Sequence, residues 1–138
     1  MMKIVFSDKK SGRTAQMEVP KESESALLGK KIGETIEGTI VGLDGFKLQI
    51  TGLSDNMGSP SRKEIDGSRK ARALIGGGPG ITKTGGGIRR RRLVRGNTIS
   101  ADTGQVNTAI AEYGSKSLDE LFPKKEKAEA KEQAPEAK

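Results

Sequence analysis

Residues 3–55 are β-rich, and several stretches within them alternate hydrophobic and polar side chains with the two-residue period of β-strands. Residues 3–7 form a short apolar strand candidate. Residues 14–19 place Ala, Met and Val at every second position, which predicts a half-buried strand. Pro20 should end that strand, because proline cannot donate to the ladder. Residues 23–28 are long enough for one or two helical turns, with the first serine as the cap and Gly29 as the stop.

The clearest local pattern is a hairpin formed by residues 35–43 and 46–51. Phe46, Leu48 and Ile50 fall on one face of its second strand, and the intervening residues are polar. Asp44-Gly45 lies between the two strands and predicts a two-residue type I′ turn, because Asp and Gly tolerate positive φ angles. Several short strands at close spacing predict a small barrel or sandwich.

The rest of the chain predicts fewer regular elements. Residues 52–60 are turn-rich, residues 69–75 suit a short strand or a helical turn, and residues 89–102 and 106–113 return to β-like patterning. Residues 76–87 hold seven glycines in twelve positions and should form an irregular loop. Residues 117–121 suit a single capped turn.

The fold class that follows is mainly β. A small β-barrel, closed or partly open, should be formed mainly by residues 3–55 and completed by strands near residues 93–113, giving one domain over residues 1–122 with a basic module at residues 56–100. Residues 123–138 should be a charged tail, disordered or helical, because residues 124–138 carry five Lys and four Glu without an apolar anchor.

Positive charge is concentrated in one block. Residues 62–95 contain eleven basic and two acidic residues, a net charge of +9, whereas the whole chain carries +7. The same block has eight glycines and no aromatic residue. A polyanion is the natural partner, and nucleic acid fits best, because each cation placed on a phosphate releases condensed counterions.

The composition excludes several classes of function. The chain has no Cys and no His, which removes disulfides, thiolate nucleophiles, zinc clusters and His-based acid–base catalysis. We expect no enzymatic activity, no cofactor, no metal and no small-molecule substrate. No stretch approaches a membrane span or a signal peptide, so we expect a cytoplasmic protein without a membrane partner. Hydrophobic content is 32% and aromatic content 3%, from which we infer that part of the chain stays unpacked or packs only against a partner.

The glycine-rich loop has two competing interpretations. A phosphate-binding P-loop would need a second glycine where Thr82 stands and a helix after Lys83-Thr84, and Gly85-Gly86-Gly87 forbids that helix. A flexible loop fits better. It is either disordered in the free protein or ordered by a nucleic-acid backbone, because backbone amides without side chains approach phosphates closely. The glycines proposed for this approach are Gly76, Gly77, Gly78, Gly80, Gly85, Gly86 and Gly87.

The four consecutive arginines at residues 89–92 are the strongest candidate contacts. Guanidinium groups pair with phosphate in a bidentate manner and also stack on bases. The absence of nearby aromatic side chains disfavours a single-strand stacking platform and favours a phosphate-dominated contact with folded RNA. The candidate RNA-binding residues are Arg62, Lys63, Arg69, Lys70, Arg72, Lys83, Arg89, Arg90, Arg91, Arg92 and Arg95.

Three acidic residues invite a catalytic interpretation. Asp55, Asp66 and Asp102 have no plausible catalytic partner by spacing, and their contexts are turn-like. Asx side chains commonly bond to their own backbone in turns, so we interpret all three as turn residues.

Several motifs together resemble the archaeal and eukaryotic small-subunit ribosomal protein six, the e-type. The resemblance covers roughly residues 2–114, and the segment around residues 90–100 is specific. The matching residues are Lys3-Ile4-Val5, Ile50-Thr51-Gly52, Ser54-Asp55, Gly58, Pro60, Arg62, the run from Arg89 to Ser100 without Leu93, and Gln105-Val106-Asn107.

The resemblance implies a structural constituent of the small (30S) ribosomal subunit. Such a protein is a non-catalytic β-barrel that binds small-subunit ribosomal RNA, lies beside neighbouring ribosomal proteins and supports translation. Arg62, Arg95 and residues 89–92 become the expected RNA contacts. The chain lacks the long phosphorylatable C-terminal helix of eukaryotic members, which indicates an archaeal version. It departs from the family where Leu53 replaces a glycine and where Ser59 and Ser61 replace Phe and Met, which puts the packing of that turn in question.

Two alternatives stay open on the residues alone. A free-standing nucleic-acid binder, such as a chromatin or RNA-chaperone protein, would have the same composition. A nucleotide-dependent enzyme would use the glycine-rich loop, and protection by a nucleoside triphosphate in a thermal-shift assay would reveal it.

Overall fold

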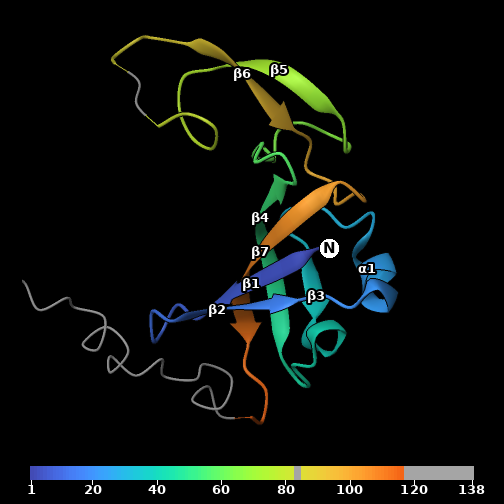
Figure 1. Cartoon of the computed structure of the whole chain (residues 1–138). Coiled ribbons are helices and arrows are strands. Elements are labelled where there is room, and N and C mark those ends of the chain that lie inside the picture. Colours follow the sequence, from blue (N-terminus) through green and yellow to red (C-terminus); the bar gives the residue numbers. More distant parts are fainter. Residues whose placement is uncertain (83–84, 117–138) are drawn as a thin grey trace, which may run out of the picture.

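The computed structural model describes residues 1–82 and 85–116 and shows a five-stranded sheet from which a two-stranded ribbon projects (Figure 1). Lys83, the turn expected at residues 117–121 and the tail at residues 123–138 lie outside the described residues. The elements in chain order are β1 (Lys3–Ser7), β2 (Thr14–Glu18), α1 (Lys21–Leu27), β3 (Thr35–Glu37), the 3₁₀ helix η1 (Gly38–Val41), β4 (Lys47–Asp55), β5 (Lys70–Ile75), β6 (Arg90–Arg95) and β7 (Thr103–Glu112).

The larger sheet has the strand order β2-β1-β7-β4-β3. β1 and β7 are parallel, with Ile4 opposite Val106, and the other neighbours are antiparallel. The predicted strands at residues 3–7, 14–19 and 106–113 are therefore confirmed. The prediction of a barrel is wrong, because β2 and β3 stand at opposite edges of an open sheet. β7 joins the sheet as expected, but β6 pairs with β5 instead of closing it.

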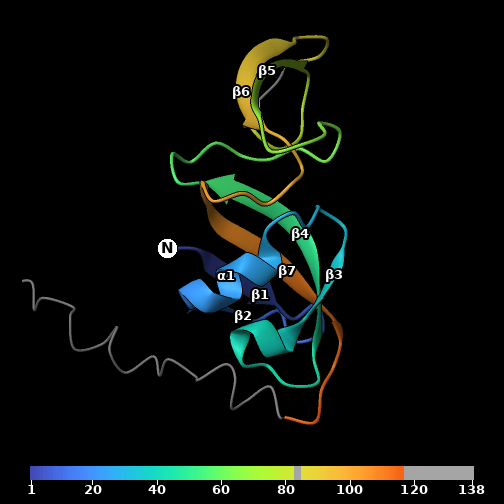
Figure 2. The same ribbon diagram turned by 90° about the vertical axis from the view of Figure 1, so that its right-hand side faces the viewer.

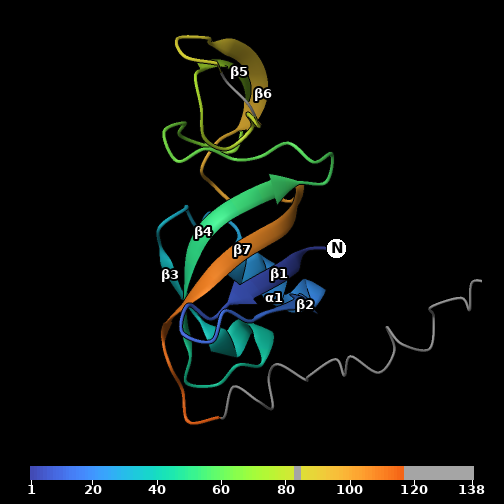
Figure 3. The same cartoon turned by 90° about the vertical axis from the view of Figure 1, so that its left-hand side faces the viewer.

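One face of the sheet carries the hydrophobic core. α1 and η1 lie on the same side of the sheet, as the two side views show (Figures 2 and 3). They cover alternating strand residues, which explains why a chain with few aromatic residues still buries a continuous core. The core side chains include Ile4, Phe6, Leu27, Val41, Phe46, Leu48, Ile50, Val106 and Ile110.

The short helix forms close to the predicted place but begins earlier. Its N-cap is Pro20, with φ −59°, and no side chain caps it. The N–H of Ser23 donates to the Pro20 carbonyl at 2.9 Å, so Ser23 is already inside the helix and the prediction that it is the cap is wrong. Gly29, with φ +84°, follows the helix as expected.

The hairpin between β3 and β4 is confirmed as a pairing, but its turn is different. The connection runs through η1 and residues 42–46 instead of two residues. Asp44 does not have a positive φ angle, so the predicted type I′ turn is absent. The predicted faces are correct, because Phe46, Leu48 and Ile50 are all buried.

An irregularity in β4 controls the residues that follow it. The pairing with β7 shifts register between Ile50 and Gly52, which is the signature of a β-bulge. One extra residue reverses the facing of every later side chain. Leu53 and Asp55 are therefore buried, although strict alternation from Leu48 would turn them to solvent.

Candidate nucleic-acid interface

The segment between β4 and β7, residues 56–102, leaves the sheet, forms the projecting ribbon of β5 and β6 and returns to the sheet (Figure 1). We call this segment the basic arm. Its β5 and β6 form an antiparallel ribbon with six residue pairs, from Lys70 opposite Arg95 to Ile75 opposite Arg90. The strand alternative predicted for residues 69–75 is therefore confirmed. The ribbon stands beyond one end of the sheet in all three views (Figures 1, 2 and 3). The arm contains all eleven basic residues of the 62–95 block.

At the base of the arm, backbone hydrogen bonds connect the end of β6 with the segments that precede β5. The N–H of Arg95 donates to the Pro60 carbonyl at 2.9 Å, and the N–H of Gly96 donates to the Arg69 carbonyl at 3.0 Å. A Cβ atom on Gly96 would lie 1.9 Å from the carbonyl oxygen of Gly67, so only glycine fits here. Asn97 donates through Nδ2 to the carbonyl of Lys63. These residues of the specific motif are therefore structural.

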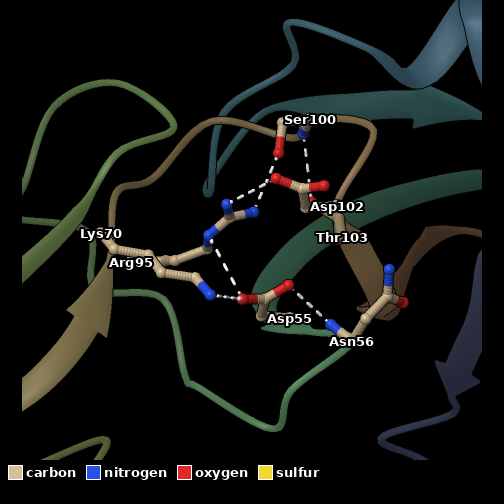
Figure 4. A network of polar contacts seen from close by, with 7 residues as sticks. All are labelled: Asp55, Asn56, Lys70, Arg95, Ser100, Asp102 and Thr103. Carbon is tan, nitrogen blue, oxygen red and sulfur yellow. Dashed lines mark hydrogen bonds and ion pairs between the residues drawn. The ribbon is translucent and has the colours of Figure 1, made fainter.

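An ion-pair network connects the arm to the sheet (Figure 4). The Arg95 guanidinium lies between two carboxylates: its Nη2 donates to Asp102 Oδ2 at 2.9 Å, and its Nε is 3.5 Å from Asp55 Oδ2. Asp55 Oδ2 is also 3.0 Å from Lys70 Nζ. Arg95 is 8% exposed and Asp55 6% exposed, so the pair is largely withdrawn from water. Ser100 Oγ accepts from Arg95 Nη1 and completes the network.

The ionisation of Asp55 reflects this setting. Burial alone raises the pKa of its carboxyl group. The Lys70 ammonium, the backbone N–H of Asn56 and the charge of Arg95 together outweigh burial, so the pKa of Asp55 lies below its ordinary value. The carboxylate is therefore charged at neutral pH and holds the two cations in place.

The glycine-rich loop is held at its first half by Arg62. The Arg62 Nη1 donates to the carbonyls of Gly77 at 3.0 Å and Pro79 at 3.2 Å, and its Nε donates to Glu64 Oε2 at 3.0 Å. The Arg62 side chain is only 13% exposed. We conclude that the guanidinium positions the loop from within the protein.

The same half of the loop packs on one face of the ribbon. A Cβ on Gly80, which has φ +96°, would lie 3.3 Å from Pro60 Cγ and 3.4 Å from Val94 Cγ1. Ile75 and Val94 are buried at this contact. The interpretation of the loop as a P-loop fails, since β6 and not a helix follows Gly85-Gly86-Gly87.

The candidate RNA-binding residues divide into two groups. Arg62 and Arg95 are enclosed by contacts within the protein, and Lys70 is shared between solvent and Asp55, so we treat these three as supports of the arm. The other described candidates are exposed and have no ion pair with any acidic residue in residues 1–82 and 85–116. They are Lys63, Arg69, Arg72, Arg89, Arg90, Arg91 and Arg92.

The candidate glycines are all exposed. Gly78, Gly80 and Gly87 have positive φ angles of 88°, 96° and 78°. No atom outside the adjacent residues would meet a Cβ on Gly77 or Gly86 within 4 Å. The remaining members of the set are Gly76 and Gly85. The backbone of the loop is thus accessible from solvent, as close approach to a phosphate requires.

Reasoning from sequence missed the part played by two aspartates. Asp55, interpreted as a turn residue, is the last residue of β4 and the buried centre of the network. Asp102 does lie in a turn, but its carboxylate also pairs with Arg95. Asp66 accepts a hydrogen bond from Asn97 at 3.2 Å. The only available signal was the presence of Asp55 and Arg95 in the motifs that carry the family resemblance.

The turn that departs from the family pattern is held by its backbone. The N–H of Asp55 donates to the Ser59 carbonyl at 2.9 Å, and the N–H of Ser61 donates to the Leu53 carbonyl at 3.0 Å. Leu53 is 4% exposed and Ser61 is 7% exposed. The turn is therefore packed without the large apolar side chains that the family usually has there.

The described residues contain no cluster of three or more acidic side chains placed to hold a metal ion. Among the helices in that part of the chain, none has the length and apolar character needed to cross a membrane.

Comparison with known proteins agrees with the motifs. Residues 2–123 match the family model described as "Ribosomal protein S6e". Similar proteins include the small ribosomal subunit protein eS6 of Methanocella arvoryzae, 48% identical over 92% of this chain and 89% of that protein. The eS6 protein of Methanocaldococcus jannaschii is 48% identical over 87% of this chain and 89% of that protein. The eS6 protein of Methanoregula boonei is 40% identical over 99% of this chain and 96% of that protein. The chain therefore belongs to the ribosomal protein S6e family of structural, non-enzymatic proteins.

Proposed function

We propose that this protein is a structural constituent of the small (30S) ribosomal subunit and that its basic arm binds small-subunit ribosomal RNA. Its relatives are archaeal proteins named for the small ribosomal subunit, and family membership carries that role to this chain. Residues 1–122 act as one RNA-binding unit and residues 123–138 as a tail. The protein acts in the cytoplasm, within the ribosome, beside other ribosomal proteins.

The observation that carries the RNA contact is the group of seven exposed cations on the arm that lack an acidic partner among the described residues. Pairing with phosphate needs accessible cations, and phosphate contacts supply most of the electrostatic affinity for nucleic acid. The exposed glycine backbone of the loop lies beside the same arginines and offers amides to phosphate oxygens. The supports Arg62 and Arg95 hold this surface in place from inside the protein.

The experiment is the salt dependence of binding to a transcript of archaeal small-subunit ribosomal RNA. Changing the arginines at residues 89–92 to Ala should lower the slope of log affinity against log salt by roughly 3 to 4, at 0.7 to 0.9 per phosphate contact. A control variant that changes four exposed lysines outside the arm should keep the wild-type slope; those lysines are Lys9, Lys10, Lys21 and Lys30. An unchanged slope in the arginine variant would exclude the run as the main RNA contact.

The alternative of a free-standing nucleic-acid binder makes a different prediction. Such a protein would bind unrelated duplexes as tightly as it binds small-subunit ribosomal RNA. It would also leave the small subunit at moderate salt, because its affinity would be wholly electrostatic.

A further inference from the structure

The pairing of β5 with β6 separates the arginines of the run onto two faces of the ribbon. Residues directly opposite each other in an antiparallel pair point to the same side, and neighbours along a strand point to opposite sides. Arg72 lies opposite Leu93, and Leu74 lies opposite Arg91. We call the side that bears these four residues the open face.

The other side of the ribbon bears Ala71, Ala73, Ile75, Arg90, Arg92 and Val94, and we call it the loop face. The large apolar side chains of the two faces differ in exposure. Ile75 and Val94 of the loop face are buried, whereas Leu74 and Leu93 of the open face are 54% and 48% exposed. Arg90 and Arg92 stay exposed on the loop face, and Arg90 lies opposite Ile75, the residue that precedes the glycine-rich loop.

Both faces offer cations that lack a counter-charge among the described residues. On the open face these are Arg72 and Arg91, since Lys70 and Arg95 at its base already pair with Asp55. On the loop face they are Arg90 and Arg92. No acidic residue occurs in either strand of the ribbon, so the positive charge of each face is neutralised only when an anion binds there.

A single RNA helix does not reach both sets of arginines. Side chains project from both faces of a β-sheet, and sheets therefore stack about 10 Å apart. The major groove of A-form RNA is deep and narrow, and its minor groove is wide and shallow, so neither encloses a two-stranded ribbon. If all four arginines contact phosphates, the RNA must approach the ribbon from two sides.

We propose that the ribbon of the basic arm lies between two segments of ribosomal RNA. One segment lies against the loop face and is bound by Arg90, Arg92 and the part of the glycine-rich loop at residues 76–82. The second lies against the open face and is bound by Arg72 and Arg91, with Leu74 and Leu93 against its sugars. This inference rests on the proposed RNA binding and adds that the arm is a spacer that joins two RNA elements.

An acidic protein is the competing occupant of the open face, because exposed leucines beside arginines also suit a protein contact. Charge favours RNA. Arg91 stands between Arg90 and Arg92 in one strand, and neither strand of the ribbon has an acidic residue, so the open face belongs to a dense block of positive charge that suits a polyanion. The test is designed so that the protein alternative appears as a separate outcome.

Two matched double variants test the inference, each of which removes two exposed arginines from one face. They are Arg72→Gln with Arg91→Gln for the open face and Arg90→Gln with Arg92→Gln for the loop face. With a transcript of small-subunit ribosomal RNA, each should lower the salt slope by roughly 1.4 to 1.8, because each loses two phosphate contacts. Thermal melts check that both variants fold, which exposed strand positions should allow.

The outcomes separate this inference from the proposed function. A wild-type slope for the open-face variant, with a reduced slope for the loop-face variant, would overturn the two-sided arrangement but keep RNA binding by the arm. The reverse pattern would overturn it equally. Wild-type slopes for both variants would overturn the proposed RNA contact itself.

Cross-linking then distinguishes two RNA segments from one. The chain has no cysteine, so Ala73→Cys on the loop face and Leu74→Cys on the open face each carry a photo-reactive benzophenone alone. In reconstituted small subunits, the two positions should cross-link to two separate tracts of ribosomal RNA. Cross-links from both positions to the same tract would overturn the inference, and so would a cross-link from the open face to a ribosomal protein.

Discussion

The ion pair between Asp55 and Arg95 should anchor the basic arm to the sheet, and a double-mutant cycle measures this. The variants are Asp55→Asn, which keeps the shape of the side chain, and Arg95→Met, which keeps most of its aliphatic stem. The Asp55 side chain is 2% exposed and that of Arg95 is 10% exposed. Each single variant leaves a poorly hydrated charge with only one of its two counter-charges: Arg95 keeps Asp102, and Asp55 keeps Lys70.

The expected magnitude follows from the contacts that remain. Removing one partner of a buried ion pair typically costs about 3–5 kcal/mol. Arg95 would keep Asp102, and Asp55 would keep Lys70 at 3.0 Å, so we expect about 2–4 kcal/mol for each single variant. The double variant strands neither charge, so the coupling energy should be at least about 1 kcal/mol, within the range for contacting residues.

The assay is urea denaturation followed by far-ultraviolet circular dichroism and by the fluorescence of Tyr113. This is the only tyrosine, and the chain has no tryptophan, so fluorescence reports on the sheet while circular dichroism reports on both parts. In the single variants the dichroism change should begin at lower urea than the fluorescence change, because the arm loses its anchor first. Additivity within about 0.5 kcal/mol would refute the coupling between Asp55 and Arg95.

Two further predictions concern single contacts. Gly96→Ala should destabilise the protein by about 2 kcal/mol or more, because its Cβ would lie 1.9 Å from the Gly67 carbonyl oxygen. Gly86→Ala, whose Cβ would meet no atom within 4 Å, should leave the stability unchanged. Thermal melts compare the two variants, and equal melting temperatures would contradict the close packing of Gly96 against Gly67. Tyr113→Phe should raise the pKa of Asp8, which hydrogen bonds from Ser11 foremost and then Tyr113 hold well below its ordinary value. A carboxylate whose pKa is depressed in the folded state stabilises the fold fully above its unfolded pKa of about 3.9, and this stabilisation is lost as the pH falls. In the variant the loss should be complete at a higher pH than in the wild-type protein. An Asp8 titration by NMR that is identical in both proteins would refute this.

Local alternation predicted most of the strands but not how they join. The burial of Phe46, Leu48 and Ile50 follows from a period of two, which depends only on neighbouring residues. The parallel pairing of β1 with β7 joins residues about a hundred positions apart, and no local pattern encodes it. The prediction of a barrel was wrong for the same reason. The local pattern of β6 predicts a strand but does not specify whether that strand pairs with the sheet or with β5.

Charge counting located the arm but did not distinguish the roles of its cations. Arg92 and Arg95 lie in one strand and look alike in the sequence, yet the first is exposed and the second is buried between two carboxylates. The difference arises from Asp55, which points inward only because of the bulge before Gly52. A bulge adds one residue without a distinctive composition, so the sequence did not show that β4 continues to Asp55 or that Asp55 points inward, and Asp55 was interpreted as a turn residue.

The most direct test of the central claim is sedimentation of the native protein from a cell lysate on sucrose gradients at low and high salt. The proposed function predicts that the protein co-migrates with the small ribosomal subunit at both salt concentrations. A variant with Ala at residues 89–92 should be released from the subunit at lower salt than the wild-type protein. Release of the wild-type protein into light fractions at moderate salt, or its spread over bulk nucleic acid, would contradict the account and favour a free-standing binder.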